Sequence, residues 1–178
     1  VIDNPDNRYL ADPFVINENN RDYCFVEDFD IEESKGSISV YEILDNTAMR
    51  VGNALVEPFH LAFPYLFRFE SKIYMLPETS ENRDIRVYES IEFPLRWKLR
   101  KILMEDIFAA DSMLFEHHGK WWLFSNINFV GGTDVCSELF IFFADHPLSE
   151  KWIPHKKNPL IVDPSKARNG GILFKNDE

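Results

Sequence analysis

Two aspartates stand at the same point of two similar segments, each just before a short apolar run. Asp12 precedes the run at residues 13–16, and Asp111 precedes the run at residues 113–115. In both segments a polar turn and a second apolar run come next, which predicts a hairpin of buried strands. Packing does not explain an acid at that point, although a strand-start Asp can also accept backbone N–H bonds. Two carboxyl groups that meet in one site can supply acid–base catalysis.

The hairpin pattern occurs four times along the chain. Aligning the apolar triplets places Asp12, Phe63, Asp111 and Gly170 at equivalent positions, spaced by 51, 48 and 59 residues. A repeat of this length, made of short strands, is typical of β-propeller blades. No segment longer than ~10 residues has a convincing amphipathic helix pattern.

The sequence therefore predicts an all-β fold, a β-propeller of four-stranded antiparallel blades, in a single incomplete domain spanning residues 1–178. We expect blade one at residues 11–57, blade two at 60–104, blade three at 109–155 and the start of blade four at 168–178. Three blades and a fragment close poorly, because a propeller joins its last blade to its first. Either the chain is a piece of a longer protein, or two copies complete each other as a homo-oligomer.

Composition limits the partners. The formal net charge of −11 argues against nucleic acid and anionic membranes. No run approaches the ~20 apolar residues that a membrane-spanning helix needs. Two cysteines do not make a disulfide framework or a metal pair, and no cofactor or metal is expected. No leader is visible, which slightly favours a cytoplasmic location, but Val1 does not look like a native start and the location stays unknown.

Other polar residues have competing interpretations. His60 precedes the first strand of blade two, and Glu78 ends the next strand. A lone His is more often structural than a ligand contact. The acidic stretch from Asp28 to Glu33 predicts a solvated loop rather than a calcium site, because the Asp-x-Asp-x-Asp-Gly pattern is absent.

A set of short motifs identifies a related family. In order along the chain they are Ala-Asp-Pro-Phe at 11–14, His60 before Phe-Pro at 63–64, Leu-Pro-Glu-Thr-Ser at 76–80, Phe-Pro-x-x-Trp at 93–97, Asp111 before Gly-Lys-Trp-Trp-Leu-Phe at 119–124, and Ala-Arg at 167–168. With this set the chain resembles the propeller domain at the N-terminal side of plant glucosamine inositolphosphorylceramide transferases and of related bacterial proteins of unassigned activity. That domain is similar to the five-bladed propellers of family 43 glycoside hydrolases.

The resemblance implies roles for some of these residues. In those hydrolases an Asp at the start of blade one is the general base, an Asp at the start of blade three tunes and orients, and a Glu entering blade four is the general acid. Asp12 and Asp111 match the first two, but Arg168 stands near where the acid is expected. A guanidinium stays protonated, so Arg168 cannot replace the acid. It could pair with a carboxylate or clamp a phosphate, and Glu78 is a less favoured substitute acid.

We therefore expect a carbohydrate-active propeller that resembles glycoside hydrolases. It would bind a sugar or sugar phosphate in an axial pocket lined by Asp12, His60, Asp111 and Arg168, with Glu78 nearby. The alternatives are a non-catalytic glycan-binding or scaffolding module, or a truncated fragment of a larger glycosyltransferase-associated protein. Whether the chain is an enzyme stays open, because the expected acid is missing.

Overall fold

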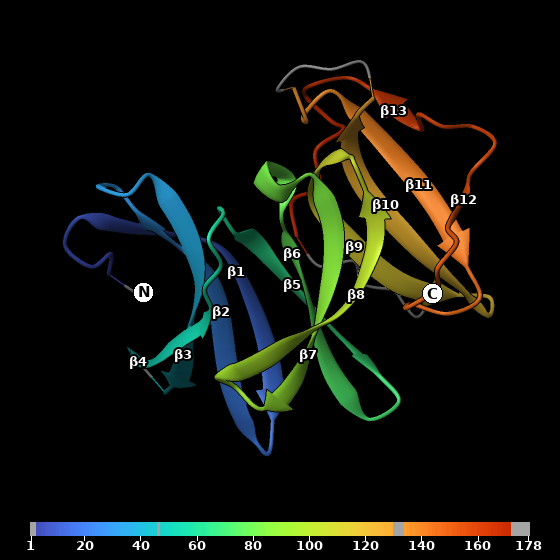
Figure 1. Cartoon of the computed structure of the whole chain (residues 1–178). Coiled ribbons are helices and arrows are strands. Elements are labelled where there is room, and N and C mark those ends of the chain that lie inside the picture. The colour runs from blue at the N-terminus through green and yellow to red at the C-terminus, as the bar shows by residue number, and fades with distance from the viewer. Residues whose placement is uncertain (1–2, 46, 130–133, 172–178) are drawn as a thin grey trace.

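Three antiparallel sheets succeed one another along the chain in the computed structural model, which describes residues 3–45, 47–129 and 134–171 (Figure 1). In each sheet, strands that follow one another in the sequence pair with each other, except that the last strand of the third sheet pairs with the strand two before it. Among the described residues the only helical element is the 3-10 turn η1(Ser80–Asn82), so none of them belongs to a helix that could cross a membrane. The predicted all-β fold of four-stranded antiparallel sheets is confirmed.

The strands of each sheet run consecutively in the sequence. The first sheet contains β1(Arg8–Glu18), β2(Arg21–Asp30), β3(Lys35–Leu44) and β4(Thr47–Leu55). The second contains β5(Ala62–Phe69), β6(Lys72–Glu78), β7(Asp84–Glu92) and β8(Arg96–Glu105). The third contains β9(Phe108–His117), β10(Lys120–Asn128), β11(Glu138–Ala144) and β12(Ile153–Pro154), and β13(Ile161–Val162) pairs with the other end of β11. The apolar run at 172–174, predicted to open a fourth blade, lies outside the described residues.

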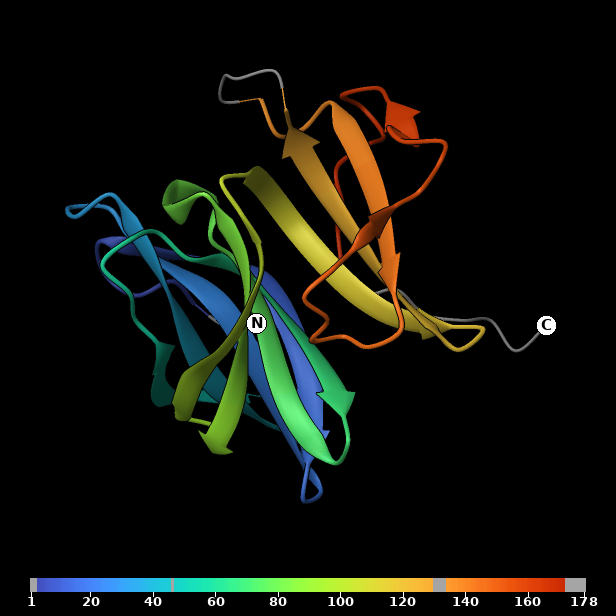
Figure 2. The same cartoon turned by 45° about the vertical axis from the view of Figure 1, so that its right-hand side comes forward.

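The sheets lie side by side and their first strands are neighbours. β1 packs beside β5, and β5 packs beside β9, as expected for successive propeller blades. Figure 2 shows the third sheet beside the second, and the three described sheets do not close into a ring. The first strands are therefore the elements that can bring distant parts of the chain to one centre.

Each sheet begins with the same kind of hairpin turn. The two loop residues have positive φ in all three hairpins: Asn19 and Asn20 (52° and 59°), Glu70 and Ser71 (47° and 61°), and His118 and Gly119 (50° and 70°). Positive φ at both loop positions defines the turn whose twist matches that of paired strands. The polar turns expected from the sequence are thus confirmed, and they fix the register of the first two strands in each sheet.

Aromatic side chains fill the space between the sheets. Phe14 of the first sheet meets Phe63 of the second edge to face, with ring centroids 4.8 Å apart. Phe67 of the second sheet contacts Trp121 of the third at 5.8 Å. Such pairs contribute about 0.5–1.5 kcal/mol each beyond the burial of their area. These contacts hold neighbouring sheets at a fixed relative position.

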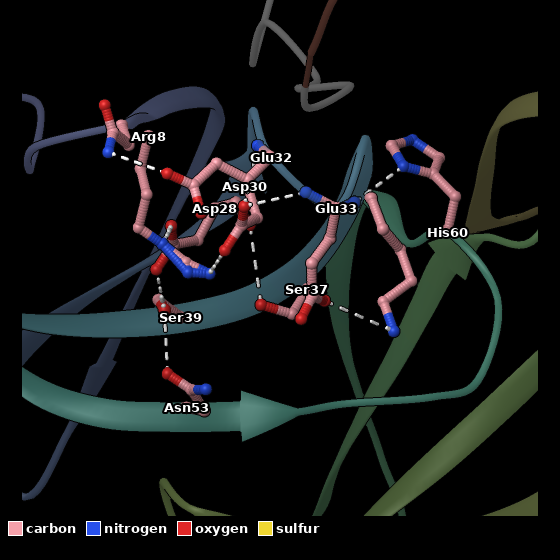
Figure 3. A network of polar contacts seen from close by, with 12 residues as sticks. Arg8, Asp28, Asp30, Glu32, Glu33, Ser37, Ser39, Asn53 and His60 are labelled. Carbon is pink, nitrogen blue, oxygen red and sulfur yellow. Dashed lines mark hydrogen bonds and ion pairs between the residues drawn. The ribbon is translucent and has the colours of Figure 1, made fainter.

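The interpretation of Asp28 as part of a solvated loop is wrong. Strand β2 continues to Asp30, and Asp28 is only 1% exposed. Its carboxylate lies 3.0 Å from Nε of Arg8 and accepts a 2.5 Å hydrogen bond from the Ser39 hydroxyl (Figure 3). Nη2 of Arg50 on β4 is 3.5 Å away. Cations from β1 and β4 offset the charge of this acid and keep it inside the sheet.

Candidate functional site

The three residues aligned in the sequence share one unusual backbone conformation. Asp12, Phe63 and Asp111 have φ values of 48°, 44° and 49°. At each of these points the pairing of the first strand with the second shifts in register, as at a β-bulge. Positive φ is uncommon for residues other than Gly and costs about 1–3 kcal/mol. Bulges re-aim side chains, so the sequence repeat is also a repeat of a strained, re-aimed position.

Ionisable side chains from all three sheets interact around these bulges. We call them the hub residues: Asp12 on β1, Glu27 on β2, His60 before β5, Glu78 at the end of β6, Asp111 on β9, and Arg168 in the segment after β13. Four of the six are carboxylic acids, and one is a permanent cation. The electrostatics of the hub are therefore dominated by acids that lie close together, two of them buried (Glu27 and Asp111) and two partly buried (Asp12 and Glu78).

Asp111 is held by Arg168. Asp111 is 3% exposed, and its Oδ2 accepts a 2.5 Å hydrogen bond from Nε of Arg168. Nη2 of Arg168 lies 3.4 Å from Oδ1 of Asp111 and 3.9 Å from Oε2 of Glu78. Burial raises the pKa of Asp111 to about 6, although Arg168 opposes the rise, and the nearby Glu78 adds to it. The guanidinium fork is thus occupied by a carboxylate of the protein itself.

A buried amide fixes the segment that carries Arg168. Asn126 on β10 is fully buried, and its Nδ2 donates to the carbonyl of Ala167 at 2.8 Å. Its Oδ1 accepts the backbone N–H of Asn169 at 3.0 Å, and Nδ2 of Asn169 donates to the carbonyl of Asp111 at 2.7 Å. Arg168 is therefore bracketed by hydrogen bonds on both sides, which orients it toward Asp111.

Asp12 is influenced by both neighbouring sheets. Burial raises its pKa, and the charge of Asp111 raises it further. A backbone hydrogen bond from Phe63 and the charge of Arg168 work in the opposite direction. The bulge of the second sheet thus supplies an N–H that favours the ionised form of the acid on the first.

Glu27 and His60 form the other side of the hub. Glu27 is 7% exposed, and its pKa rises to about 7, first through burial and then through Asp12, Glu78 and Asp111. Nε2 of His60 lies 3.7 Å from Oε1 of Glu27. Burial lowers the pKa of His60. These two side chains are therefore mutually adjacent titratable groups in a low-dielectric environment.

The tautomer of His60 is set by its other nitrogen. Nδ1 accepts the backbone N–H of Gly36 at 2.8 Å, so the neutral ring carries its proton on Nε2, the atom nearer Glu27. Gly36 has no room for a side chain, because an added Cβ would lie 2.3 Å from the carbonyl oxygen of Leu61. The glycine thus permits the close approach that fixes the ring (His60 is labelled in Figure 3).

Comparison with known proteins identifies the family. Residues 3–178 match the family model described as glucosamine inositolphosphorylceramide transferase 1, N-terminal. The chain belongs to this family. Glucosamine inositolphosphorylceramide transferase 1 from Oryza sativa subsp. japonica is 36% identical over 170 residues, and that from Arabidopsis thaliana is 35% identical over 173 residues. These alignments cover 93% and 95% of this chain but only 23% and 22% of the relatives, so the chain spans under a quarter of their length.

Solved structures show the fold of this domain. A family 117 glycoside hydrolase from the marine bacterium Zobellia galactanivorans superposes with a TM-score of 0.67 at 15% identity, over 88% of this chain and 58% of that one. The exo-beta-1,3-galactanase from Phanerochaete chrysosporium, solved with beta-1,3-galactotriose, superposes with a TM-score of 0.66 at 12% identity, over 84% of this chain and 36% of that one. A family 43 glycoside hydrolase protein from Bacillus licheniformis superposes with a TM-score of 0.61 at 12% identity, over 85% of this chain and 30% of that one. The partial propeller is confirmed, and the five-bladed count stays a prediction.

In this transferase-family domain, the structure brings together the residues singled out from the sequence. Asp12, Glu78, Asp111 and Arg168 interact directly or electrostatically, and His60 reaches them through Glu27. Their roles in function stay predictions. Among the described residues, no group of three or more His, Cys, Asp or Glu side chains is arranged to hold a metal ion.

Sequence reasoning missed two residues of the site in this domain, Glu27 and Asn126. Both are nearly or fully buried polar residues within strands that are otherwise largely apolar. That mismatch is the signal that could have found them, because buried polar groups need a partner or a function.

Proposed function

We propose that this chain is a carbohydrate-binding propeller domain whose sugar ligand lies against the hub residues. The observation that carries the proposal is the convergence of four acids from three separate sheets, two of them at strained bulges. Burial and mutual repulsion raise the pKa of Asp12, Glu27 and Asp111 together, which is unfavourable for folding. Acids with pKa values shifted by burial and by specific neighbouring charges cluster at functional sites.

The chemistry of the hub suits sugar hydroxyl groups. Carboxyl oxygens accept hydrogen bonds from hydroxyls, and bonds to an ionised acceptor contribute about 1.5–3 kcal/mol. A fold shared with glycoside hydrolases, one of them solved with beta-1,3-galactotriose, supports the same ligand class. The family name, which refers to a glucosamine transferase, is also consistent with a sugar.

A neutral sugar suits the hub better than a sugar phosphate. Arg168 is the hub's permanent cation, and Asp111 already occupies its fork. A phosphate would have to displace that carboxylate and then face Asp12, Glu27 and Glu78. Like charges in a buried site repel strongly, so we propose an uncharged ligand.

A non-catalytic role is the second candidate. Arg168 stands near where the related hydrolases have their acid, and it cannot donate a proton. The share of the relatives that this chain covers, 23%, fits a module that presents a glycan to another part of a larger glycosyltransferase-associated protein. The proposal above covers only the binding step, which a catalytic and a non-catalytic domain share. The two differ only in whether the bound sugar is then cleaved.

Isothermal titration calorimetry against a panel of neutral mono- and oligosaccharides, including beta-1,3-galactotriose, tests the proposal. We expect at least one sugar to bind, and Asp111→Asn to weaken it by about 10–100-fold through loss of a charged acceptor. Glu89→Gln is the matched control, because this carboxylate on β7 pairs with Lys72 away from the hub. Circular dichroism checks that each variant is folded. Binding that Asp111→Asn leaves unchanged, or a panel with no binder, would refute the proposal.

A further inference from the structure

Glu27 differs from the other three acids of the hub in its contacts. Asp111 pairs with Arg168, Asp12 accepts a backbone hydrogen bond from Phe63, and Glu78 accepts a 2.7 Å hydrogen bond from Ser80. Within the described ranges, the carboxyl of Glu27 has no such hydrogen bond, and the polar atom beside it is Nε2 of His60 at 3.7 Å. It is therefore the hub acid with the least support for a negative charge.

We infer that Glu27 is the acid that protonates the leaving oxygen when this domain cleaves a glycoside, with Asp12 as the base. The inference rests on the proposed sugar site and adds a reaction and a residue to it. It also explains how protonation could occur although Arg168 stands near where related hydrolases have their acid. The proton donor would be Glu27 on β2 of the first sheet, not a residue in the segment after β13. Hydrolysis needs one protonated and one ionised carboxyl, and of these two acids only Asp12 accepts a backbone N–H that favours the ionised form.

The surroundings of Glu27 favour its protonated form up to about neutral pH. The groups that face it are Tyr9 and Asp12 from β1, His60, Glu78 from β6, Asp111 from β9 and Arg168 from the segment after β13. Burial and the three neighbouring acids raise its pKa to about 7, against the smaller opposing effect of Arg168. Burial and the charge of Asp111 raise the pKa of Asp12 as well, but Asp12 accepts a backbone N–H from Phe63 that favours its charged form, and Glu27 has no such donor.

The step balances with water as the co-reactant. Asp12 takes a proton from a water molecule, whose oxygen forms a bond to the anomeric carbon. The bond from that carbon to the leaving oxygen breaks, and the proton of Glu27 moves to this oxygen. The products are a free sugar and an alcohol, with Glu27 ionised and Asp12 protonated. Exchange with solvent then returns one proton to Glu27 and removes one from Asp12.

His60 acts here as a positioning residue. Its Nδ1 is fixed by the N–H of Gly36, so its Nε2–H is the atom that faces Glu27. A donor on that side favours one orientation of the carboxyl and leaves the other oxygen for the substrate. Because burial lowers the pKa of His60 and favours its neutral ring, the ring does not force Glu27 to ionise.

The test uses aryl glycosides whose leaving groups differ in their need for a proton. The probes are phenyl and 2,4-dinitrophenyl glycosides of galactose, arabinofuranose, xylose and glucosamine, assayed with the chain of residues 1–178. For Glu27→Gln we expect kcat/KM on the phenyl glycoside to fall about 10²–10⁴-fold, because protonation is lost. The 2,4-dinitrophenolate group leaves without protonation, so the rate on the 2,4-dinitrophenyl glycoside should fall less than tenfold. The basic limb of the pH–rate profile should disappear.

Each outcome separates this inference from the proposed sugar site. Glu89→Gln is the control and should match the wild-type rates on both probes. Equal losses on both probes in Glu27→Gln would show a structural role and overturn the inference. Sugar binding by calorimetry with no hydrolysis of any probe would overturn it while the binding proposal stands. If no sugar binds and no probe is cleaved, both proposals fall.

Discussion

Replacing Glu27 with Gln should stabilise the folded protein at pH 8 and much less at pH 5. The pKa of Glu27 rises from 4.5 to about 7 on folding, mainly through burial. An acid whose pKa is raised in the folded state contributes stability at low pH, and that contribution is lost as the pH rises through the folded value. The full difference of about 2.5 units corresponds to about 3.4 kcal/mol, of which about 2.5 kcal/mol falls between pH 5 and pH 8. Gln resembles the protonated acid and avoids this loss.

Urea unfolding followed by tryptophan fluorescence measures the effect at both pH values. The gain from Glu27→Gln relative to wild type should be about 2–3 kcal/mol larger at pH 8 than at pH 5. Glu89→Gln should instead destabilise the protein by a similar amount at both pH values, because the hydrogen bond from Lys72 lowers the pKa of Glu89 and the acid is already ionised at pH 5. A gain for Glu27→Gln that is the same at both pH values would refute the description of Glu27 as a buried, unsupported acid.

Three further variants test other parts of the structure. Arg168→Met should raise the pKa of Asp111 above about 6 and lower the free energy of unfolding by about 1–2 kcal/mol at pH 7, a modest loss because Arg168 is half exposed. At pH 4 the loss should be smaller, because Asp111 is then protonated. An equal loss at both pH values would contradict this. Asp28→Ala should cost about 1–3 kcal/mol by the same assay, since it removes the carboxylate that the buried Ser39 hydroxyl and the partly exposed Arg8 and Arg50 contact, and a loss below about 0.5 kcal/mol would show that the network is not stabilising. Gly36→Ala should cost about 1–3 kcal/mol, because its Cβ would lie 2.3 Å from the carbonyl oxygen of Leu61, and an unchanged melting temperature would count against that packing.

The repeated hairpins could be predicted from the sequence because they depend on local chemistry. Two apolar runs flank each two-residue turn, and a turn with Asn19 and Asn20 or with His118 and Gly119 tolerates positive φ. The alignment of Asp12 with Asp111 also came from these runs. It proved to be an alignment of backbone conformation as well, since both residues have φ near 50°.

The environment of Glu27 and Asp28 could not be predicted in the same way. Adjacent residues of a strand point to opposite faces, so one faces the hub while the other faces Arg8 and Arg50. The partners of Asp28 come from β1 and β4, and those of Glu27 come from three sheets. Such contacts between residues far apart in the sequence depend on strand register and sheet packing, which local composition does not determine.

The position of a bound sugar decides whether the hub is the binding site. A crystal of this chain soaked with the saccharide that binds in calorimetry would show where the ligand lies. We predict sugar hydroxyls within hydrogen-bond distance of Asp12, Glu27 and Asp111. A saccharide bound on an outer strand or on the hairpin turns, with these three acids untouched, would contradict the proposed site.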